Sequence, residues 1–305
     1  MAELILHHFD ASPFAEKVRL ALGIKSLPWR SVEIPMIMPK PNLTALTGGY
    51  RKTPVLQVGA EIYCDTGLII KQVESQFPEP ALFSAGGEAL QAALAAWSDQ
   101  HFFEPGAALS MALNEEIPQP LLDDRKAFFS FMDFSELKSS VPHMTDQFLA
   151  QVAVVEDQLA HGQAYLAGGQ VSMTDILGYF PLWMIRANVP GGAQWLEEFP
   201  RVGAWLQRMD RIGHGQRSEM PAEEALDIAK AASPQPGVGV MDNAANLRQG
   251  DHVTATPTDY GAVAVEGTLQ TLDRRIIMLR RTDARVGEVN VYFPRAGFEV
   301  AASGS

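Results

Sequence analysis

Residues 4–23 read LILHHFDASPFAEKVRLALG, and this stretch decides the fold of the first domain. The apolar run Leu4–Phe9 has the length of a buried strand. It ends at Asp10-Ala11-Ser12-Pro13, a cluster of turn and capping residues. From Phe14 onward apolar side chains recur at helical spacing, with Pro13 suited to the first helical position and Gly23 expected just past the last turn. The stretch therefore predicts a strand, a turn and a helix.

The next segments extend this unit. An alternating strand is expected over Trp29–Ile34, followed by a proline-interrupted linker and one short helical turn at Leu43–Leu46. Two strands joined by Gly59-Ala60 should then form an antiparallel hairpin, Thr53–Val58 with Glu61–Cys64. A last helix is expected over Gly67–Gln76, which ends before Pro78. Residues 1–80 thus predict a βαβ–ββα domain of the thioredoxin-like α/β type.

Two further parts follow. Residues 86–233 show helical periodicity with almost no strand signal, which predicts an all-helical domain of about six helices. Within it, Ser172-Met173-Thr174-Asp175 has the spacing of a capping box at a helix start. Beyond residue 237 the pattern changes to alternating β-branched runs, so residues 240–305 predict a small antiparallel β-module, for which an SH3-like barrel is one possible form.

Composition excludes several classes of function. The formal net charge is −12, and residues 81–235 hold 20 acidic against 9 basic residues, which indicates a solvated helical surface. No basic stripe marks a nucleic-acid or anionic-membrane partner. No long apolar run or signal-peptide pattern is present, so we expect a cytoplasmic protein. The single cysteine, Cys64, rules out an internal disulfide and a multi-cysteine metal site, and a buried small side chain is favoured over a reactive thiol.

Three short motifs in the first domain could bind a ligand. Ser12 stands at a predicted helix N-terminus, where free N–H groups and the helix dipole favour an anion such as a thiolate. Thr53-Pro54 begins a strand, where a cis proline would turn the Thr53 backbone toward a peptide-like ligand. Asp65-Thr66 starts another helix. Each motif has an ordinary alternative, namely a helix cap or a trans proline, and only their combination favours a site.

These motifs resemble the glutathione transferase superfamily, and the serine- and cysteine-type classes in particular, over residues 1 to about 232. The resemblance rests on SPFAEKVR at 12–19, KTPVL at 52–56, DTGLI at 65–69 and SMTD at 172–175. It implies glutathione as co-substrate, no metal, and a homodimer. It also implies that Ser12 hydrogen-bonds the glutathione sulfur, with serine in place of cysteine favouring thiolate stabilisation over disulfide exchange. The other implied glutathione contacts are Phe14, Lys40, Lys52, Thr53, Pro54, Asp65 and Thr66, of which Lys40 has a solvated surface lysine as its stronger alternative.

The second substrate would lie between the domains, against apolar side chains of the first long helices. Candidates are Trp97, Phe102, Phe103, Met111 and Phe128, for each of which core packing is the alternative. His7, His8 and His101 are weaker candidates as bases, because no nucleophile pairs with them. The resemblance implies conjugation of glutathione to a small apolar electrophile. The alternatives are a glutathione-dependent isomerase or dehalogenase, and a non-catalytic binding protein whose β-module recruits a partner or covers the site.

Overall fold

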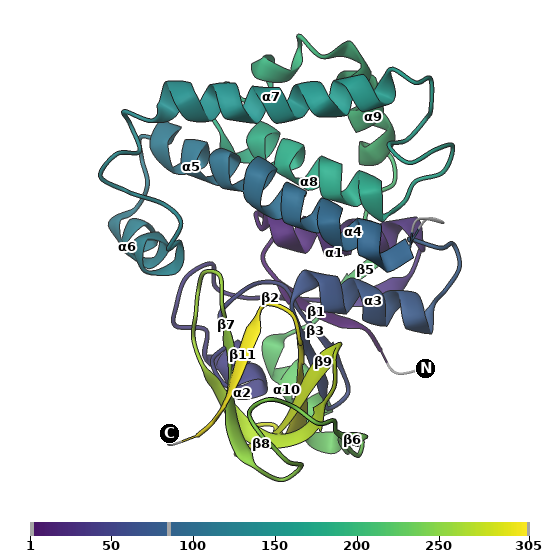
Figure 1. Cartoon of the computed structure of the whole chain (residues 1–305), viewed down its shortest axis with the longest axis vertical. Coiled ribbons are helices and arrows are strands. Elements are labelled where there is room, and N and C mark those ends of the chain that lie inside the picture. The colour runs from purple at the N-terminus through teal and green to yellow at the C-terminus, as the bar shows by residue number, and fades with distance from the viewer. Residues whose placement is uncertain (1–2, 84–86, 304–305) are drawn as a thin grey trace.

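The computed structural model describes residues 3–83 and 87–303, and its first part has the predicted order of strands and helices (Figure 1). The elements are β1 (Ile5–His8), α1 (Pro13–Ile24), β2 (Pro28–Glu33), α2 (Pro41–Thr47), β3 (Val55–Val58), β4 (Glu61–Cys64) and α3 (Thr66–Gln76). Strand β1 pairs in parallel with β2 and antiparallel with β3, and β3 pairs antiparallel with β4. The thioredoxin-like prediction is thereby confirmed.

Gly23 does not end the first helix as predicted. It lies inside α1, which continues to Ile24 and is capped by Lys25. A Cβ atom at Gly23 would lie 2.0 Å from the carbonyl oxygen of Gly213. The glycine is therefore needed because a distant loop approaches the helix closely at this position. In the sequence, a glycine near the end of a helix looks the same whether it allows such a contact or ends the helix.

The helical part forms the upper half of the molecule in Figure 1. Its elements are α4 (Gly87–Ala96), a π-helical turn (Trp97–Phe102), α5 (Phe103–Leu113), α6 (Gln119–Phe128), α7 (Val141–Leu159), α8 (Met173–Asn188), a 3₁₀ turn (Gln194–Leu196) and α9 (Pro200–Asp210). The predicted capping box is present at the start of α8. The buried Asp175 carboxylate accepts hydrogen bonds from the Ser172 and Leu166 N–H groups and from the Trp205 indole, which ties three segments together.

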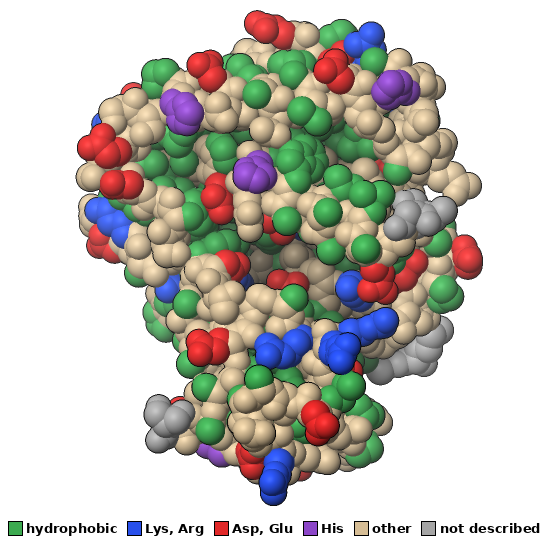
Figure 2. Space-filling view, viewed as in Figure 1, with side chains coloured by type: hydrophobic (Ala, Val, Ile, Leu, Met, Phe, Trp, Pro, Cys, Tyr) green, Lys and Arg blue, Asp and Glu red, His purple; other side chains and the backbone are tan. Residues whose placement is uncertain are grey.

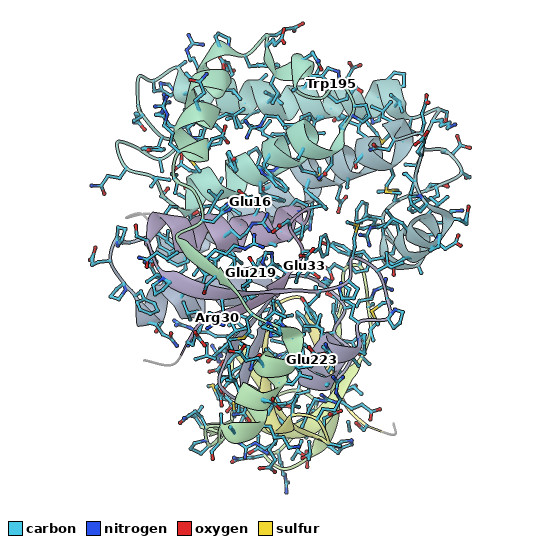
Figure 3. All side chains as sticks on the ribbon, turned by 180° about the vertical axis from the view of Figure 1, so that it is seen from behind. Glu16, Arg30, Glu33, Trp195, Glu219 and Glu223 are labelled. Atoms are coloured by element: carbon cyan, nitrogen blue, oxygen red, sulfur yellow. The ribbon has the colours of Figure 1, made fainter. Side chains whose placement is uncertain are left out.

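The end of this part differs from the sequence prediction. Residues 216–231 were expected in the helical domain, but β5 (Gln216–Glu219) pairs in parallel with β2 and α10 (Ala222–Ala231) packs against the first sheet. The Arg30 side chain of β2 donates to the Glu219 carbonyl of β5 at 3.3 Å, and both residues are labelled in Figure 3. The segment QRSE is too short and too polar to be recognised as an edge strand from its sequence.

The β-rich C-terminal part continues the first sheet. Its strands are β6 (Gly239–Val240), β7 (His252–Pro257), β8 (Val265–Leu272), β9 (Ile276–Asp283), β10 (Gly287–Pro294) and β11 (Phe298–Ala302). Strands β7 to β10 form an antiparallel meander, and β10 pairs in parallel with β4, with Val291 opposite Ile62. One sheet with the order β11-β7-β8-β9-β10-β4-β3-β1-β2-β5 results. The antiparallel module is confirmed.

The buried apolar residues in the described part of the chain form two large clusters and two small ones. One large cluster joins α1, α3 and the first sheet to the long helices, with Trp29, Phe148 and Trp205 among its fully buried members. The other is shared between the first domain and the C-terminal strands, where Val55, Ile62 and buried Cys64 pack with residues such as Leu279 and Val291. The C-terminal strands therefore have no core separate from that of the first domain.

The predicted acidic surface also appears in the structure. Acidic side chains are scattered over the helical half in the view of Figure 2 and form no single patch there. Among the helices of the described residues, none has both the length and the apolar character needed to span a bilayer.

We predict that stability falls as the pH drops from about 6.5 toward 4. Burial lowers the pKa of His7 to about 4 and, together with Arg19 and Arg217, lowers that of His8 to about 3. Both rings stay neutral in the folded state while the unfolded state gains protons below about 6.5, so folding loses up to about tenfold per pH unit per histidine. Urea midpoints across this range test the effect. His7→Gln should flatten the dependence, whereas the exposed His161→Gln should not; equal slopes in all three proteins would contradict the prediction.

The shared core predicts a single unfolding transition. Val291→Ala at the fully buried centre of β10 should lower the free energy of unfolding by about 2 kcal/mol. It should also shift one thermal transition for the entire β-sheet, because β10 and β4 bury the same side chains. Val238→Ala, at a position 85% exposed, is the matched control. Two separate transitions, with only the weaker one shifted by Val291→Ala, would show that the C-terminal strands fold independently.

Candidate functional site

A cavity of about 600 Å³ lies between the first domain and the helices α5, α6 and α8. The first domain contributes the turn before α1, the segment around Lys40 and the residues before β3. The helical part contributes mainly apolar side chains, and Tyr260 of the C-terminal strands completes the wall. The cavity therefore combines a polar side, which carries several of the predicted residues, with an apolar side.

Ser12 lies on the polar side and caps α1. Its backbone is extended, with φ −78° and ψ 117°, and its Oγ accepts a hydrogen bond from the Ala15 N–H at 3.2 Å. The ordinary capping role is thus present. Accepting this bond does not use the hydroxyl proton, so the same oxygen can still donate to a ligand. Because the N–H groups of the first helical turn point the same way, this corner of the cavity favours a negative charge.

Arg19 supports the turn that carries Ser12. Its guanidinium donates to the carbonyls of Phe9 and Asp10, at 3.4 and 2.9 Å, and forms a buried ion pair with Glu16. Glu16 in turn contacts the His214 ring at 3.0 Å, beside the loop that lies against Gly23. The position of Glu16 on α1 can be followed in Figure 3.

The Thr53–Pro54 peptide bond is cis, in agreement with the sequence expectation. Thr53 lines the cavity, whereas Pro54 is buried behind it. The Thr53 hydroxyl accepts a hydrogen bond from the Lys40 ammonium at 3.2 Å. Lys40 is only 4% exposed, so the reading as a solvated surface lysine is wrong. Burial, with smaller effects from neighbouring charges, lowers the Lys40 pKa to about 8.

Lys52 is held by a segment that the sequence did not connect with this site. Its ammonium forms an ion pair with the Asp259 carboxylate and lies 4.4 Å from the centre of the Tyr260 ring. Both partners belong to residues 258–263, between β7 and β8, which we call the cover loop. Ring contacts from Tyr260 to Phe128 and Phe131, and a Gly261 N–H bond of 3.0 Å to the Phe128 carbonyl, fasten this loop to the end of α6.

The structure does not bring Asp65 and Thr66 into the cavity. Asp65 adopts a positive φ of 83° and accepts hydrogen bonds from the Gly67 and Leu68 N–H groups, so it acts as the cap of α3. Burial raises its pKa, against the effect of the Gly67 N–H bond. The Tyr260 pKa is raised by burial and by a group of carboxylates that includes Asp65. The cavity wall therefore contains Tyr260 of the cover loop and neither Asp65 nor Thr66.

The apolar candidates divide into two groups. Phe14, Phe103, Met111 and Phe128 line the cavity, and Phe14 packs edge-on against Phe103 at 4.7 Å. Phe102 is completely buried in the helical core, and the Trp97 indole donates to Gln151 away from the cavity. The two are thus excluded from the pocket wall because the π-helical turn directs both toward α7.

The candidate bases lie elsewhere as well. The His7 and His8 rings are buried in the first sheet, against the Gln57 and Ser31 side chains, and His101 is exposed. Since the cavity wall contains none of these three residues, they are structural or surface histidines.

Sequence reasoning missed an ion cluster in the cavity wall. Arg51 and Arg125 each donate to the Asp124 carboxylate at 2.8 Å, and Asp124 also accepts the Met38 N–H at 3.1 Å. Charged residues on an amphipathic helix such as α6 usually face solvent, so the pattern of α6 contained no signal for this arrangement.

Comparisons with known proteins agree with the fold. The family model for the glutathione S-transferase N-terminal domain matches residues 6–81, and that for the C-terminal domain matches residues 138–208. A GST-like protein from Pseudomonas syringae is 40% identical with a TM-score of 0.80, and the similarity covers 99% of this chain and 100% of that chain. The C-terminal strands are therefore present in that protein too.

More distant relatives lack part of the chain. Glutathione S-transferase U4 of Arabidopsis thaliana is 20% identical over 226 residues, which are 73% of this chain and 91% of that protein. A theta class glutathione S-transferase from Xanthomonas axonopodis, solved with glutathione bound, is 21% identical with a TM-score of 0.50. It covers 68% of this chain and 92% of its own. With both domain models matched, and with 40% identity to a GST-like protein over nearly all of its length, the chain belongs to the glutathione transferase superfamily.

Proposed function

We propose that this protein is a transferase that conjugates the glutathione thiolate to a small apolar electrophile. The observation that carries the proposal is the position of Ser12 on the cavity wall, at the N-terminus of α1 and opposite apolar side chains of α5. The Ser12 hydroxyl would donate a hydrogen bond to the sulfur, and the positive end of the α1 dipole would stabilise its negative charge. Both effects lower the thiol pKa and so raise the thiolate fraction at neutral pH.

The rest of glutathione would extend from Ser12 along the polar side of the cavity. The Thr53 backbone beside cis-Pro54 would pair with the cysteinyl residue, with Phe14 next to it. Lys40 and Lys52 are the cations available to the glycine carboxylate, and Asp65 and Thr66 would bind the γ-glutamyl end. Because Lys52 is paired with Asp259, and because Asp65 and Thr66 are not part of the cavity wall, glutathione would contact all of these residues only after the cover loop moves.

Ser12→Ala tests the catalytic assignment. We expect kcat/KM for conjugation to fall by about 10- to 100-fold, because a hydrogen bond to a charged sulfur is lost. The pH profile should also move to higher pH, since the thiol pKa of bound glutathione rises. Both are measured by steady-state conjugation of a chloronitroarene across a range of pH.

The same substitution removes a helix cap, which costs about 1 kcal/mol of stability. Ser172→Ala is therefore the matched control, because it weakens the cap of α8 at a residue outside the cavity wall. It should lower the thermal midpoint and leave kcat/KM and the pH profile unchanged. Wild-type conjugation by Ser12→Ala would refute the role of the hydroxyl.

A second candidate function is supported by the cover loop. The Asp259 carboxylate is paired with the Lys52 ammonium, and Tyr260 lines the cavity beside it. A glutathione-transferase fold in which the chain itself occupies part of the glutathione site would serve as a non-catalytic binding protein. The two candidates differ in whether glutathione can displace the cover loop.

Asp259→Asn separates these candidates. It removes the internal competitor for Lys52, so glutathione should bind more tightly, by up to about fivefold, since exposed ion pairs contribute at most about 1 kcal/mol. Titration calorimetry at low salt measures the change, and the exposed Asp242→Asn is the control. No heat with glutathione in wild type or variant would favour the binding protein. Equal affinity in the two proteins would show that Asp259 does not compete.

We further propose a cytoplasmic homodimer, on the basis of the family. Members of the family usually pair the first domain of one chain with the helices of the other. In this chain β10 pairs with the edge of β4, so that edge is not available to a second chain. A dimer would therefore have to use other surfaces of the first domain and the helices.

A further inference from the structure

Three basic side chains converge on one part of the cavity wall. They are Lys40, Arg51 and Arg125, which we call the basic cluster, and the two arginines form ion pairs with the carboxylate of Asp124. Burial lowers the pKa of Lys40 most, and the nearby charges of Arg125 and Arg51 lower it further while Asp124 raises it. The cluster joins the polar side of the cavity to α6.

The charge of the cluster is not balanced. Among the described residues, Asp124 is the one carboxylate within ion-pair distance of either arginine, and no carboxylate lies within that distance of Lys40. The side chains of Arg51 and Arg125 are only 12% and 15% exposed. A surplus of positive charge that is largely removed from water is costly unless an anion accompanies it. This surplus occurs in a chain whose formal net charge is −12.

The arginines are also positioned to receive a planar anion. The Arg51 guanidinium lies 4.7 Å from the centre of the Phe128 ring, and the Arg125 guanidinium lies 6.0 Å from both Phe128 and Phe129. Ring contacts of this kind hold a guanidinium through its face, so its N–H edges stay available. Each arginine has five N–H donors, and Asp124 takes one from Arg51 and one from Arg125.

We propose that the basic cluster binds a carboxylate of the second substrate, so that the acceptor is an electrophile with an apolar body and an anionic end. Met111 and Phe128 would contact the apolar body, and the N–H edges of Arg51 and Arg125 would hold the carboxylate. This inference rests on the proposed transferase activity and narrows its substrate class. Its alternative, that the cluster holds the carboxylate of glutathione itself, is an outcome of the test below.

The reaction can be followed with a chloronitrobenzoate whose chlorine lies ortho to the nitro group and para to the carboxylate. The glutathione thiol first loses its proton to solvent. Its sulfur then forms a bond to the ring carbon that carries chlorine, and the carbon–chlorine bond breaks with chloride taking the electron pair. The carboxylate forms and breaks no bond in this reaction. A preference of the enzyme for the benzoate, once the uncatalysed rates are divided out, therefore measures how well the protein binds the carboxylate. The corresponding chloronitrobenzamide is the neutral counterpart.

The experiment compares kcat/KM for the benzoate and the benzamide, each divided by its uncatalysed rate. Wild-type protein should prefer the benzoate, and Arg125→Gln and Arg51→Gln should each reduce this preference by about 10- to 100-fold, as expected for a charge-assisted hydrogen bond. Lys126→Gln is the matched control, because Lys126 is exposed on the same helix and does not line the cavity. It should retain the wild-type preference. Thermal unfolding confirms that each variant is folded.

Other results would overturn the proposal. The proposal is wrong if both arginine variants keep the wild-type preference for the benzoate. It is also wrong if they raise KM for glutathione and leave that preference intact, because the cluster would then bind the carboxylate of glutathione. If wild type conjugates neither acceptor, the transferase proposal fails on its own. Calorimetric titration of the benzoate alone then tests whether the basic cluster binds a carboxylate. Weaker binding to Arg125→Gln than to wild type supports the anion site, and no binding to wild type refutes it.

Discussion

The parallel pairing of β10 with β4 is the contact on which the rest of the arrangement depends. It attaches the C-terminal strands of the sheet to the first domain, with Val291 opposite Ile62, and creates a core that the two parts share. Side-chain contacts stabilise the pairing further. The Glu61 carboxylate accepts hydrogen bonds from Asn290 and Tyr292, and the Tyr292 ring stacks on Tyr63. Because such buried polar groups are costly when unpaired, they also help to specify the register of the two strands.

This pairing has a direct consequence for the cavity. Once β10 is fixed beside β4, the turn between β7 and β8 reaches the first domain, and Asp259 and Tyr260 arrive at Lys52. The same loop is fastened to α6 through Phe128. A single loop thus touches both domains that form the cavity, and its position couples the added strands to any ligand that enters.

The cavity itself combines two electrostatic arrangements of different origin. Near Ser12 the positive character comes from backbone N–H groups at the start of α1, and it needs no charged side chain. Near α6 it comes from Arg51 and Arg125, whose charges Asp124 compensates only in part. Apolar side chains of α5, among them Phe103 and Met111, line the same cavity. Because the two positive regions are separate, one could hold a thiolate and the other a second anion within the same cavity.

The sequence by itself determined the local structure. Hydrophobic periodicity and capping residues predicted the βαβ–ββα order, the cap at Ser12 and the box at Ser172, because each depends on residues adjacent in the chain. Only the tertiary structure decided which of these reach the cavity. It placed Asp65 at the cap of α3, buried Phe102 and Lys40, joined β10 to β4, and brought Asp259 to Lys52 across 207 positions. Such contacts depend on packing between distant segments, and no local pattern of residue types encodes the distance between them.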